Sequence, residues 1–371
     1  MANVFITLKL IARQALPRLI ENLVFPNLVY RNYSDTFQNL GDTVQVRKPT
    51  ILTAEEFNAE TGVTYQDMKE PSVDVRLDRL ATVDAQASVI ETAVNIDDLN
   101  RVFIEPAAVA LAEKINADGL KLYADVPYAV GTAGTTPSDL SAMANARKQL
   151  NINKAPVTGR VAVWDPEADA AFTQIPAIVN AEKSGSTMAL REGSIGRVMG
   201  FDNYMAQGVV HHESGVTASS AVKTSGTVAA GDTSLNLTGT TLTGKLSKGD
   251  ILTIKGLTYV VTEDSADASS NAISGVKVYP ALPALASNVT VTIAASHTAN
   301  LAFLPQAFAF VTRPLLNPDG QGVASYVTSY NGISLRVTKG YDQKYKRSTY
   351  SMDVLYGYKT VYPELAVRVM G

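Results

Sequence analysis

The stretch LSKGDILTIKG occupies residues 246–256. The apolar run Ile251-Leu252-Thr253-Ile254 follows the turn-forming residues Lys248-Gly249-Asp250. Short runs of this kind, bounded by Gly, Asp and Ser, predict β-strands joined by tight turns. Similar runs recur at residues 234–237, 276–279 and 289–293.

The surrounding segment, residues 216–299, has a composition of its own. Thr, Ser and Gly supply 32 of its 84 residues, and it contains no Arg, Phe, Trp or Met. This composition, with its evenly spaced strand signals, predicts an all-β module, a small barrel or sandwich.

The chain on either side of this module mixes helices and strands. Before it, Thr136-Pro137 predicts a helix start, with Thr136 as the cap and Pro137 at the first helical position. Residues 160–164 then predict a strand, and Asp165-Pro166-Glu167 opens another helix. After it, two alternating runs flank Asn331-Gly332, a strong hairpin signal. Residues 350–358 and 365–369 also alternate. The β-module is therefore an insertion into an α+β body.

The N-terminal third predicts a helix, a ribbon and a second helix. Residues 5–25 have apolar residues at helical spacing, with Pro17 expected to kink or break the helix and Pro26 to end it. Residues 43–47 and 73–78 alternate as two strands. A long helix is expected over residues 96–125, starting at Asp97-Asp98 or at Pro106.

Charge and composition argue against some classes of function. Of the 371 residues, 46% are hydrophobic and 18% are charged, below the usual share of about 25%. The net charge of −3 argues against a dedicated nucleic-acid binder, and the absence of cysteine excludes disulfides and thiolate metal sites. We expect no membrane span, and no export signal in the N-terminal residues.

Catalytic patterns are scarce. Both ends of the insertion carry histidines, and a metal site formed by His211, His212, Glu213 and His297 is one interpretation. Solvated histidines in a polar linker are the simpler one, because the spacing lacks an HExxH pattern. The Gly-rich stretches lack the residues of a phosphate loop. We therefore expect no enzyme activity, no cofactor and no bound metal.

Several motifs, in order, resemble those of tailed-phage coat proteins of the podovirus type. They are Tyr30-Arg31-Asn32-Tyr33, Gly41-Asp42-Thr43-Val44, residues 160–166 (RVAVWDP), residues 193–204 (GSIGRVMGFDNY), residues 246–256 and residues 304–310 (LPQAFAF). The resemblance spans nearly the whole chain. It implies a Hong-Kong-97-type α+β fold with an inserted β-barrel.

The resemblance also implies a division of the chain and a function. The expected parts are an N-terminal arm (1–40), an extended β-hairpin loop (41–90), a peripheral domain with a spine helix (91–127 and 345–371), an apical domain (128–215 and 298–344) and the inserted barrel (216–297). The implied function is a major capsid protein that forms the hexamers and pentamers of an icosahedral head around double-stranded DNA. The implied partners are other copies, a scaffolding protein, a portal protein and weakly held DNA on the inner face, and a decoration protein is a further candidate partner. The expected location is the virion, after assembly in the host cytoplasm.

A charged loop suggests how copies meet. Residues 53–71 hold five acidic residues against one lysine, a net charge of −4, whereas residues 1–50 carry a net charge of +3. We expect the acidic loop to dock on a basic surface of the next copy, in residues 1–50 or at Lys344–Arg347. The candidate contact residues are Glu55, Glu56, Glu60, Asp67, Glu70, Arg13, Arg18, Arg31, Lys344, Lys346 and Arg347.

Two other classes of function remain open. A bacterial surface protein would use the Thr- and Ser-rich module for adhesion, although the sequence lacks an evident signal peptide. A metal-dependent enzyme would use the four residues at the ends of the insertion.

Overall fold

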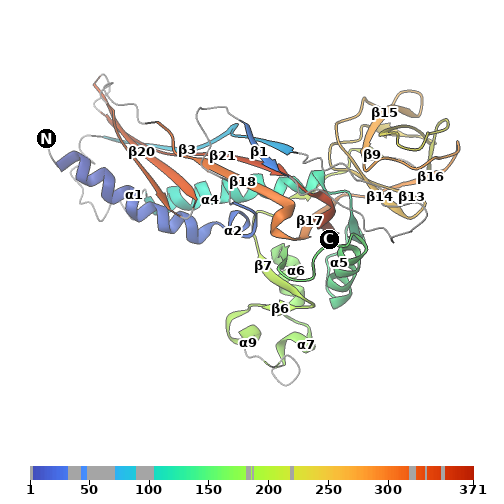
Figure 1. Cartoon of the computed structure of the whole chain (residues 1–371), viewed down its shortest axis with the longest axis horizontal. Helices are drawn as coiled ribbons and strands as arrows, with labels where there is room; N and C mark the ends of the chain where they lie inside the picture. The colour runs from blue at the N-terminus through green and yellow to red at the C-terminus, as the bar shows by residue number, and fades with distance from the viewer. Residues whose placement is uncertain are drawn as a thin grey trace, which may run out of the picture. The chain divides into compact units, whose positions relative to one another are not determined.

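The computed structural model describes residues 3–31, 43–47, 72–88, 104–180, 185, 188–217, 221–316, 323–330, 332–343 and 347–371. The chain forms two compact units, each discontinuous in sequence. The first comprises Met1–Pro17, Arg31–Ala108 and Phe308–Val361; the second comprises Arg18–Tyr30, Val109–Ala307 and Tyr362–Gly371. Figure 1 traces the chain through them.

The first unit is built on an antiparallel five-stranded sheet. Its strands are β3 (Arg79–Ser88), β18 (Phe308–Arg313), β19 (Ala324–Tyr330), β20 (Ile333–Asp342) and β21 (Arg347–Thr360). The order is β18-β21-β20-β19, and β3 also pairs with β21. The predicted hairpin is confirmed, since β19 and β20 pair from Tyr330 and Ile333 onward.

A two-stranded ribbon belongs to the same unit. Strands β1 (Thr43–Arg47) and β2 (Ser72–Arg76) pair antiparallel with Thr43 opposite Arg76, as their alternation predicts. At the base of the ribbon, a side chain at Gly357 of β21 would collide with the carbonyl of Arg76. Glycine there allows β2 and β21 to lie backbone against backbone. The acidic residues 53–71 between the strands lie outside the described residues.

The N-terminal helix is not broken at Pro17, and it ends earlier than predicted, before Pro26. Helix α1 (Asn3–Asn22) runs through Pro17 without a break. Pro17 is exposed, so water can satisfy the carbonyl that loses its helical partner. The helix ends at Asn22, before Pro26, because the N–H groups of Val24 and Phe25 turn to Oδ1 of Asn116, 3.1 and 3.2 Å away. Pro26 instead lies in the first turn of the short helix α2 (Phe25–Leu28).

The second long helix begins at the later of its two predicted starts. Helix α4 (Glu105–Leu120) has Pro106 in its first turn, a position where the missing N–H costs nothing. The alternative start at Asp97-Asp98 lies outside the described residues. The last turn expected of this helix is a 3-10 helix, η3 (Lys121–Asp125). No described helix is long and apolar enough to cross a bilayer.

A mixed seven-stranded sheet forms the lobe of the second unit. Its order is β4-β22-β17-β5-β7-β6, and β8 pairs with β17. The bounds are β4 (Ala129–Gly131), β5 (Arg160–Trp164), β6 (Arg197–Val198), β7 (Phe201–Met205), β8 (His211–His212), β17 (His297–Phe303) and β22 (Ala366–Met370). Short 3-10 helices, η4 (Pro305–Ala307) and η5 (Pro363–Leu365), lie near the ends of β17 and β22.

Helices α5 (Leu140–Ile152) and α6 (Pro166–Phe172) pack on this sheet. Met143 and Leu150 of α5 and Phe172 of α6 share one core with Trp164 of β5. The ring centroids of Trp164 and Phe172 lie 4.8 Å apart, edge to face. Two short helices, α7 (Pro176–Val179) and α9 (Met188–Glu192), complete the lobe. The strand at residues 160–164 and the helix after Asp165 are confirmed.

The predicted start of α5 was wrong. The helix begins at Leu140 with Asp139 at its N-cap position, and Thr136 and Pro137 precede it. The segment before it is held beside the C-terminus, where the N–H of Gly134 donates to the carbonyl oxygen of Gly371 over 3.1 Å. Residues 136–138 lie outside the helix.

The inserted module is a closed barrel of six strands in the order β10-β11-β15-β14-β13-β16. They are β10 (Val222–Thr224), β11 (Ser234–Thr238), β13 (Ile251–Ile254), β14 (Leu257–Val261), β15 (Ala272–Tyr279) and β16 (Thr290–Ile293). Two further short strands, β9 (Val216–Thr217) and β12 (Thr243–Gly244), pair with each other. Closure pairs both edges of the sheet and removes free strand edges.

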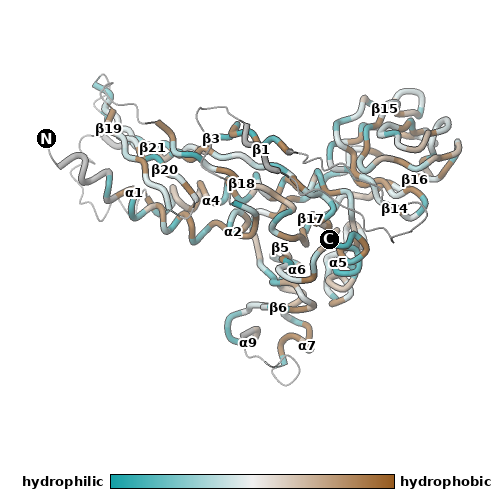
Figure 2. The backbone as a smooth tube through the Cα atoms, in the orientation of Figure 1, coloured by the Kyte–Doolittle hydropathy of each residue, from teal (hydrophilic) through white to brown (hydrophobic). Residues whose placement is uncertain are grey.

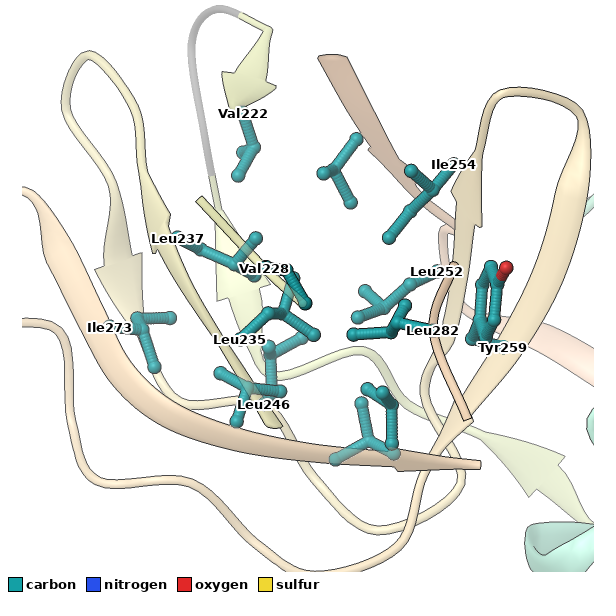
Figure 3. Close-up of a cluster of buried hydrophobic side chains, with 14 of the residues drawn as sticks. Val222, Val228, Leu235, Leu237, Leu246, Leu252, Ile254, Tyr259, Ile273 and Leu282 are labelled. Atoms are coloured by element: carbon teal, nitrogen blue, oxygen red, sulfur yellow. The ribbon is translucent and has the colours of Figure 1, made fainter. Parts of the chain in front are cut away.

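The barrel core is filled by side chains. Figure 3 shows Leu235, Leu237, Leu252 and Leu282 directed toward one another inside the barrel. Figure 2 shows hydrophilic and hydrophobic residues intermixed along the barrel, and in β11 the buried Leu235 and Leu237 alternate with exposed polar residues. The interior is therefore a packed core.

Candidate functional site

The predicted contact residues are only partly described. The five acidic residues of the loop, Lys344 and Lys346 lie outside the described residues. Arg13 and Arg18 are exposed on α1. Arg31 follows α2 and is half-buried, which lowers the pKa of its guanidinium. Arg347 is exposed at the start of β21, with Nη1 3.3 Å from Oε1 of Gln86. The docking role of all these residues stays a prediction.

His212 and His297, at the two ends of the insertion, lie next to each other. Strand β8 pairs with β17 so that His212 lies opposite His297, and their ring centroids are 5.4 Å apart. The rings of both residues are buried, whereas His211 and Glu213 are exposed. Because β8 enters the insertion and β17 leaves it, this pairing closes the base of the inserted segment.

His212 bridges the lobe and the barrel. Its Nε2 lies 2.8 Å from Oδ1 of Asp250, and its Nδ1 lies 3.0 Å from the hydroxyl of Tyr123. A carboxylate only accepts hydrogen bonds, so Nε2 donates and, on the neutral ring, Nδ1 accepts the tyrosine proton. Burial raises the pKa of Tyr123, which keeps that proton in place. One ring thus ties η3 to the turn before β13.

Arg368 of β22 lies fully buried beside the histidines. Its Nη1 donates to the carbonyl oxygen of Gly249 over 2.8 Å, and its Nη2 donates to that of Tyr123 over 2.7 Å. Its Cζ also lies 4.7 Å from the ring centroid of Tyr123. Burial lowers the pKa of Arg368 to about 10, so the side chain stays charged at neutral pH.

His297 completes this cluster as a neutral ring. Its Nδ1 lies 2.7 Å from the carbonyl oxygen of Ala295 and therefore donates. Its Nε2 then offers a lone pair to Nη1 of Arg368, 3.4 Å away. Burial first, and then the charge of Arg368, lower the pKa of His297 to about 4. A protonated ring would place two cations side by side.

Gly249 and Asp250, in the turn before β13, form the contacts of the barrel with these side chains. Gly249 has a φ of +99°, and a Cβ there would lie 3.0 Å from Cβ of Ala124. Asp250 is fully buried, and its second oxygen accepts the N–H of Ser247 over 2.7 Å. We name the five side chains Tyr123, His212, Asp250, His297 and Arg368 the base cluster.

Two further contacts hold the barrel to the lobe. The hydroxyl of Tyr279, on β15, donates to Oε1 of Glu364 in η5 over 2.7 Å. Burial and this carboxylate raise the pKa of Tyr279 well above its usual value. Lys248 forms an ion pair of 2.8 Å with Asp125 of η3. The barrel is therefore positioned by specific polar contacts at its base.

The metal-site interpretation gains no support from this geometry. Both ring nitrogens of His212 and of His297 are engaged with protein atoms. Within the described part of the chain, no group of three or more His, Asp or Glu residues is arranged to hold a metal ion.

Sequence reasoning found the two buried histidines and missed their partners. Asp250 looks like an ordinary turn residue in Lys248-Gly249-Asp250. Arg368 could have been noticed in the sequence, because it is the charged residue within an otherwise apolar strand, Ala366–Met370. Nothing in the sequence marks Tyr123, since it lies near the end of a predicted helix.

The fold has counterparts among solved structures. No protein-family model matches the chain, and no curated protein sequence matches it. A chain from Mycobacterium phage Che8 superposes with a TM-score of 0.53 at 18% identity, covering 94% of this chain and 90% of that one. A chain from the capsid structure of cyanophage P-SCSP1u gives a TM-score of 0.52 at 14% identity, covering 94% and 88%. The fold is a phage capsid fold.

The extent of the two superpositions supports the assignment of the fold. Both superpositions extend over nearly all of each chain, including the body on either side of the insertion. The predicted fold class, α+β of the phage capsid type with an inserted all-β barrel, is confirmed. At 14–18% identity, it is the fold that these structures share with this chain.

Proposed function

We propose that this chain is the major capsid protein of a tailed bacteriophage. One observation carries the proposal: the superpositions with the phage capsid fold cover 94% of the chain. In this role the protein is structural and non-catalytic, and its partners are first of all other copies of itself.

The five parts expected from the sequence fit this role as a proposed division. Residues 1–40 form the N-terminal arm, 41–90 the extended loop, 91–127 with 345–371 the peripheral domain, 128–215 with 298–344 the apical domain, and 216–297 the inserted barrel. Helix α4 is the spine helix of the peripheral domain. The base cluster then fixes the barrel to the rest of its unit in every subunit of the shell.

The low share of charged residues suits a subunit that covers much of its surface with other copies. With 18% charged residues, the chain contains a smaller share of charged residues than most soluble proteins. Exposed ion pairs between subunits contribute only about 0–1 kcal/mol each. Many such contacts together stabilise a closed shell, while a single misplaced subunit can still leave. Hexamers and pentamers built in this way enclose double-stranded DNA, touching it weakly on the inner face.

The remaining partners follow from the same proposal. A scaffolding protein guides assembly of the procapsid in the host cytoplasm and a portal protein occupies one vertex, and a decoration protein is a further candidate partner. The mature location is the virion.

Electron microscopy of the overexpressed chain tests the proposal. We expect shell-like particles or tubular polyheads in negative stain, together with pentamers or hexamers in mass photometry. A chain that stays a compact monomer at high protein concentration contradicts the proposed function.

A further inference from the structure

The outer face of α5 is an unusually basic surface in an acidic chain. Residues 140–164 contain Arg147, Lys148, Lys154 and Arg160 and no acidic residue, although the whole chain has a net charge of −3. Arg147 and Lys148 are exposed, and neither forms an ion pair with any carboxylate among the described residues. Two cations on one helical turn therefore lack a counter-charge within their own subunit.

A third cation lies beneath them. Arg160 is 1% exposed, and its Nη2 donates to Oδ1 of Asn151 and to the carbonyl oxygen of Ala155, both over 2.8 Å. Its Nη1 has no partner among the described residues. Burial lowers the pKa of Arg160, and the nearby charge of Arg147 lowers it further. Arg160 therefore adds a buried positive charge beneath the surface formed by Arg147 and Lys148.

The same face has a shallow hollow of about 490 Å³ that is lined by both apolar and charged side chains. Ala144, Arg147, Lys148, Asn151 and Ile152 line it at helical spacing, and Met199 closes one side. Ile152 is 61% exposed and Met199 is 37% exposed. Met199 also adopts a φ of 53°, which side-chain-bearing residues rarely do. Exposed apolar side chains between unpaired cations indicate a protein-contact surface.

The complementary charge lies on α6 of the same lobe. Residues 165–182 contain four acidic residues and no basic one. Glu167 is exposed, and Asp169 is half-buried with its pKa raised by burial and by the charge of Asp165. Neither carboxylate meets a lysine or arginine among the described residues. The hydroxyl of Thr136 donates to Glu167 over 3.4 Å.

We propose that α5 of one copy docks against the start of α6 of the next, with Arg147 and Lys148 facing Glu167 and Asp169. This inference rests on the proposed function, because it names a contact between subunits of one ring. Since the two surfaces are different patches of one chain, the contact is head-to-tail. A head-to-tail contact repeated by rotation closes a ring.

A second copy fits this surface better than nucleic acid does. A phosphate backbone would use the cations but would leave Ile152 and Met199 uncovered. A neighbouring lobe covers the apolar side chains and neutralises the cations together, in a contact where charge complementarity sets the register. It also neutralises Glu167 and Asp169, which an anionic polymer would repel.

Charge reversal tests the pairing. The variants Arg147→Glu with Lys148→Glu, and Glu167→Lys with Asp169→Lys, each place like charges across the contact. Each is expected to lower the yield of rings and shells more than about tenfold. The variant with all four substitutions restores opposite charges and is expected to restore assembly. Thermal unfolding of each variant monitors folding of the subunit.

The barrel offers a matched control. Lys223 and Lys255 are exposed, and neither forms an ion pair among the described residues. The variant Lys223→Glu with Lys255→Glu makes the same change in net charge and is expected to assemble normally. Normal rings from the α5 variant, or no rescue by the fourfold variant, overturn the inference, whereas the proposed function fails only if the unsubstituted chain does not assemble.

Carbodiimide cross-linking provides a measurement on the unsubstituted protein. The reagent joins a lysine amine to a carboxylate in direct contact, releasing the carboxylate oxygen as part of a urea. In shells assembled from ¹⁴N- and ¹⁵N-labelled chains, peptides linking Lys148 to Glu167 or Asp169 are expected with mixed labels. Shells that give other cross-links between subunits but not this one contradict the pairing.

Discussion

Nη1 of Arg368 lies 2.8 Å from the carbonyl oxygen of Gly249, which joins a strand of the lobe to a turn of the inserted barrel. These residues are 119 positions apart in the chain. The guanidinium also donates to the carbonyl of Tyr123, so one buried side chain satisfies backbone acceptors from both sides of the barrel base. Arg368 is therefore one of the side chains that fix the position of the barrel in its unit.

Replacing Arg368 by Met is expected to destabilise the protein by about 2–4 kcal/mol. The substitution removes the side-chain donor to the carbonyl oxygen of Gly249. It also removes one of two donors to the carbonyl oxygen of Tyr123, which still accepts the N–H of Val126, and it leaves Asp250 with less positive charge nearby. Urea denaturation followed by tryptophan fluorescence measures the loss. The control Arg197→Met removes an exposed pair with Asp202 (3.7 Å) and is expected to cost about 0–1 kcal/mol. Equal effects of the two substitutions contradict the role assigned to Arg368.

The stability of the protein is expected to fall as the pH decreases from about 6.5 to about 4. The pKa of His297 is about 4 in the folded chain and 6.5 in the unfolded chain, so in this range the unfolded state binds the extra proton. The difference corresponds to at most about 3 kcal/mol. Thermal unfolding across pH 4–7 measures it.

The variant His297→Gln isolates that contribution. A glutamine amide can donate to Ala295 and accept from Arg368 without titrating, so a flatter pH dependence is expected. The variant His211→Gln serves as its control, because His211 is exposed and should leave the pH dependence largely intact. A His297→Gln profile as steep as that of the unsubstituted protein would rule out His297 as the titrating group.

Gly249→Ala is expected to cost about 2–3 kcal/mol, and Gly256→Ala about 1 kcal/mol. Both glycines have positive φ, +99° and +79°, so both substitutions strain the backbone. Only at Gly249 does the added Cβ meet other atoms, those of Ala124 at 3.0 and 3.2 Å. The difference between the two variants in urea denaturation therefore reports the close approach of barrel and η3. No difference would mean that this approach can relax freely.

Local patterns predicted most elements of the fold. The alternation of Ile251-Leu252-Thr253-Ile254 and its neighbours predicted the barrel strands, and Asn331-Gly332 predicted the hairpin, because both signals lie within a few residues. The start of α5 was missed: the helix begins at Leu140, and the chain before it contacts Gly371 through Gly134, more than 230 residues away, a contact that local patterns do not encode. The base cluster was found only in part for the same reason. The histidines lie at the ends of a recognisable insertion, whereas the partners of Arg368 are set by the folded chain alone.

Reversing Glu55, Glu56 and Glu60 to Lys is expected to block shell assembly and leave the subunit folded. These residues belong to the acidic loop, which in the proposed function docks on a basic surface of the next copy. Three reversed charges turn each attraction into repulsion at every repeat of the contact, so small effects of about 0–1 kcal/mol per pair accumulate over the shell. Negative-stain microscopy counts the shells, and circular dichroism checks the fold. Because the loop and the α5 surface are separate contacts, shells of normal number from this variant would remove the loop from the assembly contacts and leave the α5–α6 pairing to be judged on its own variants.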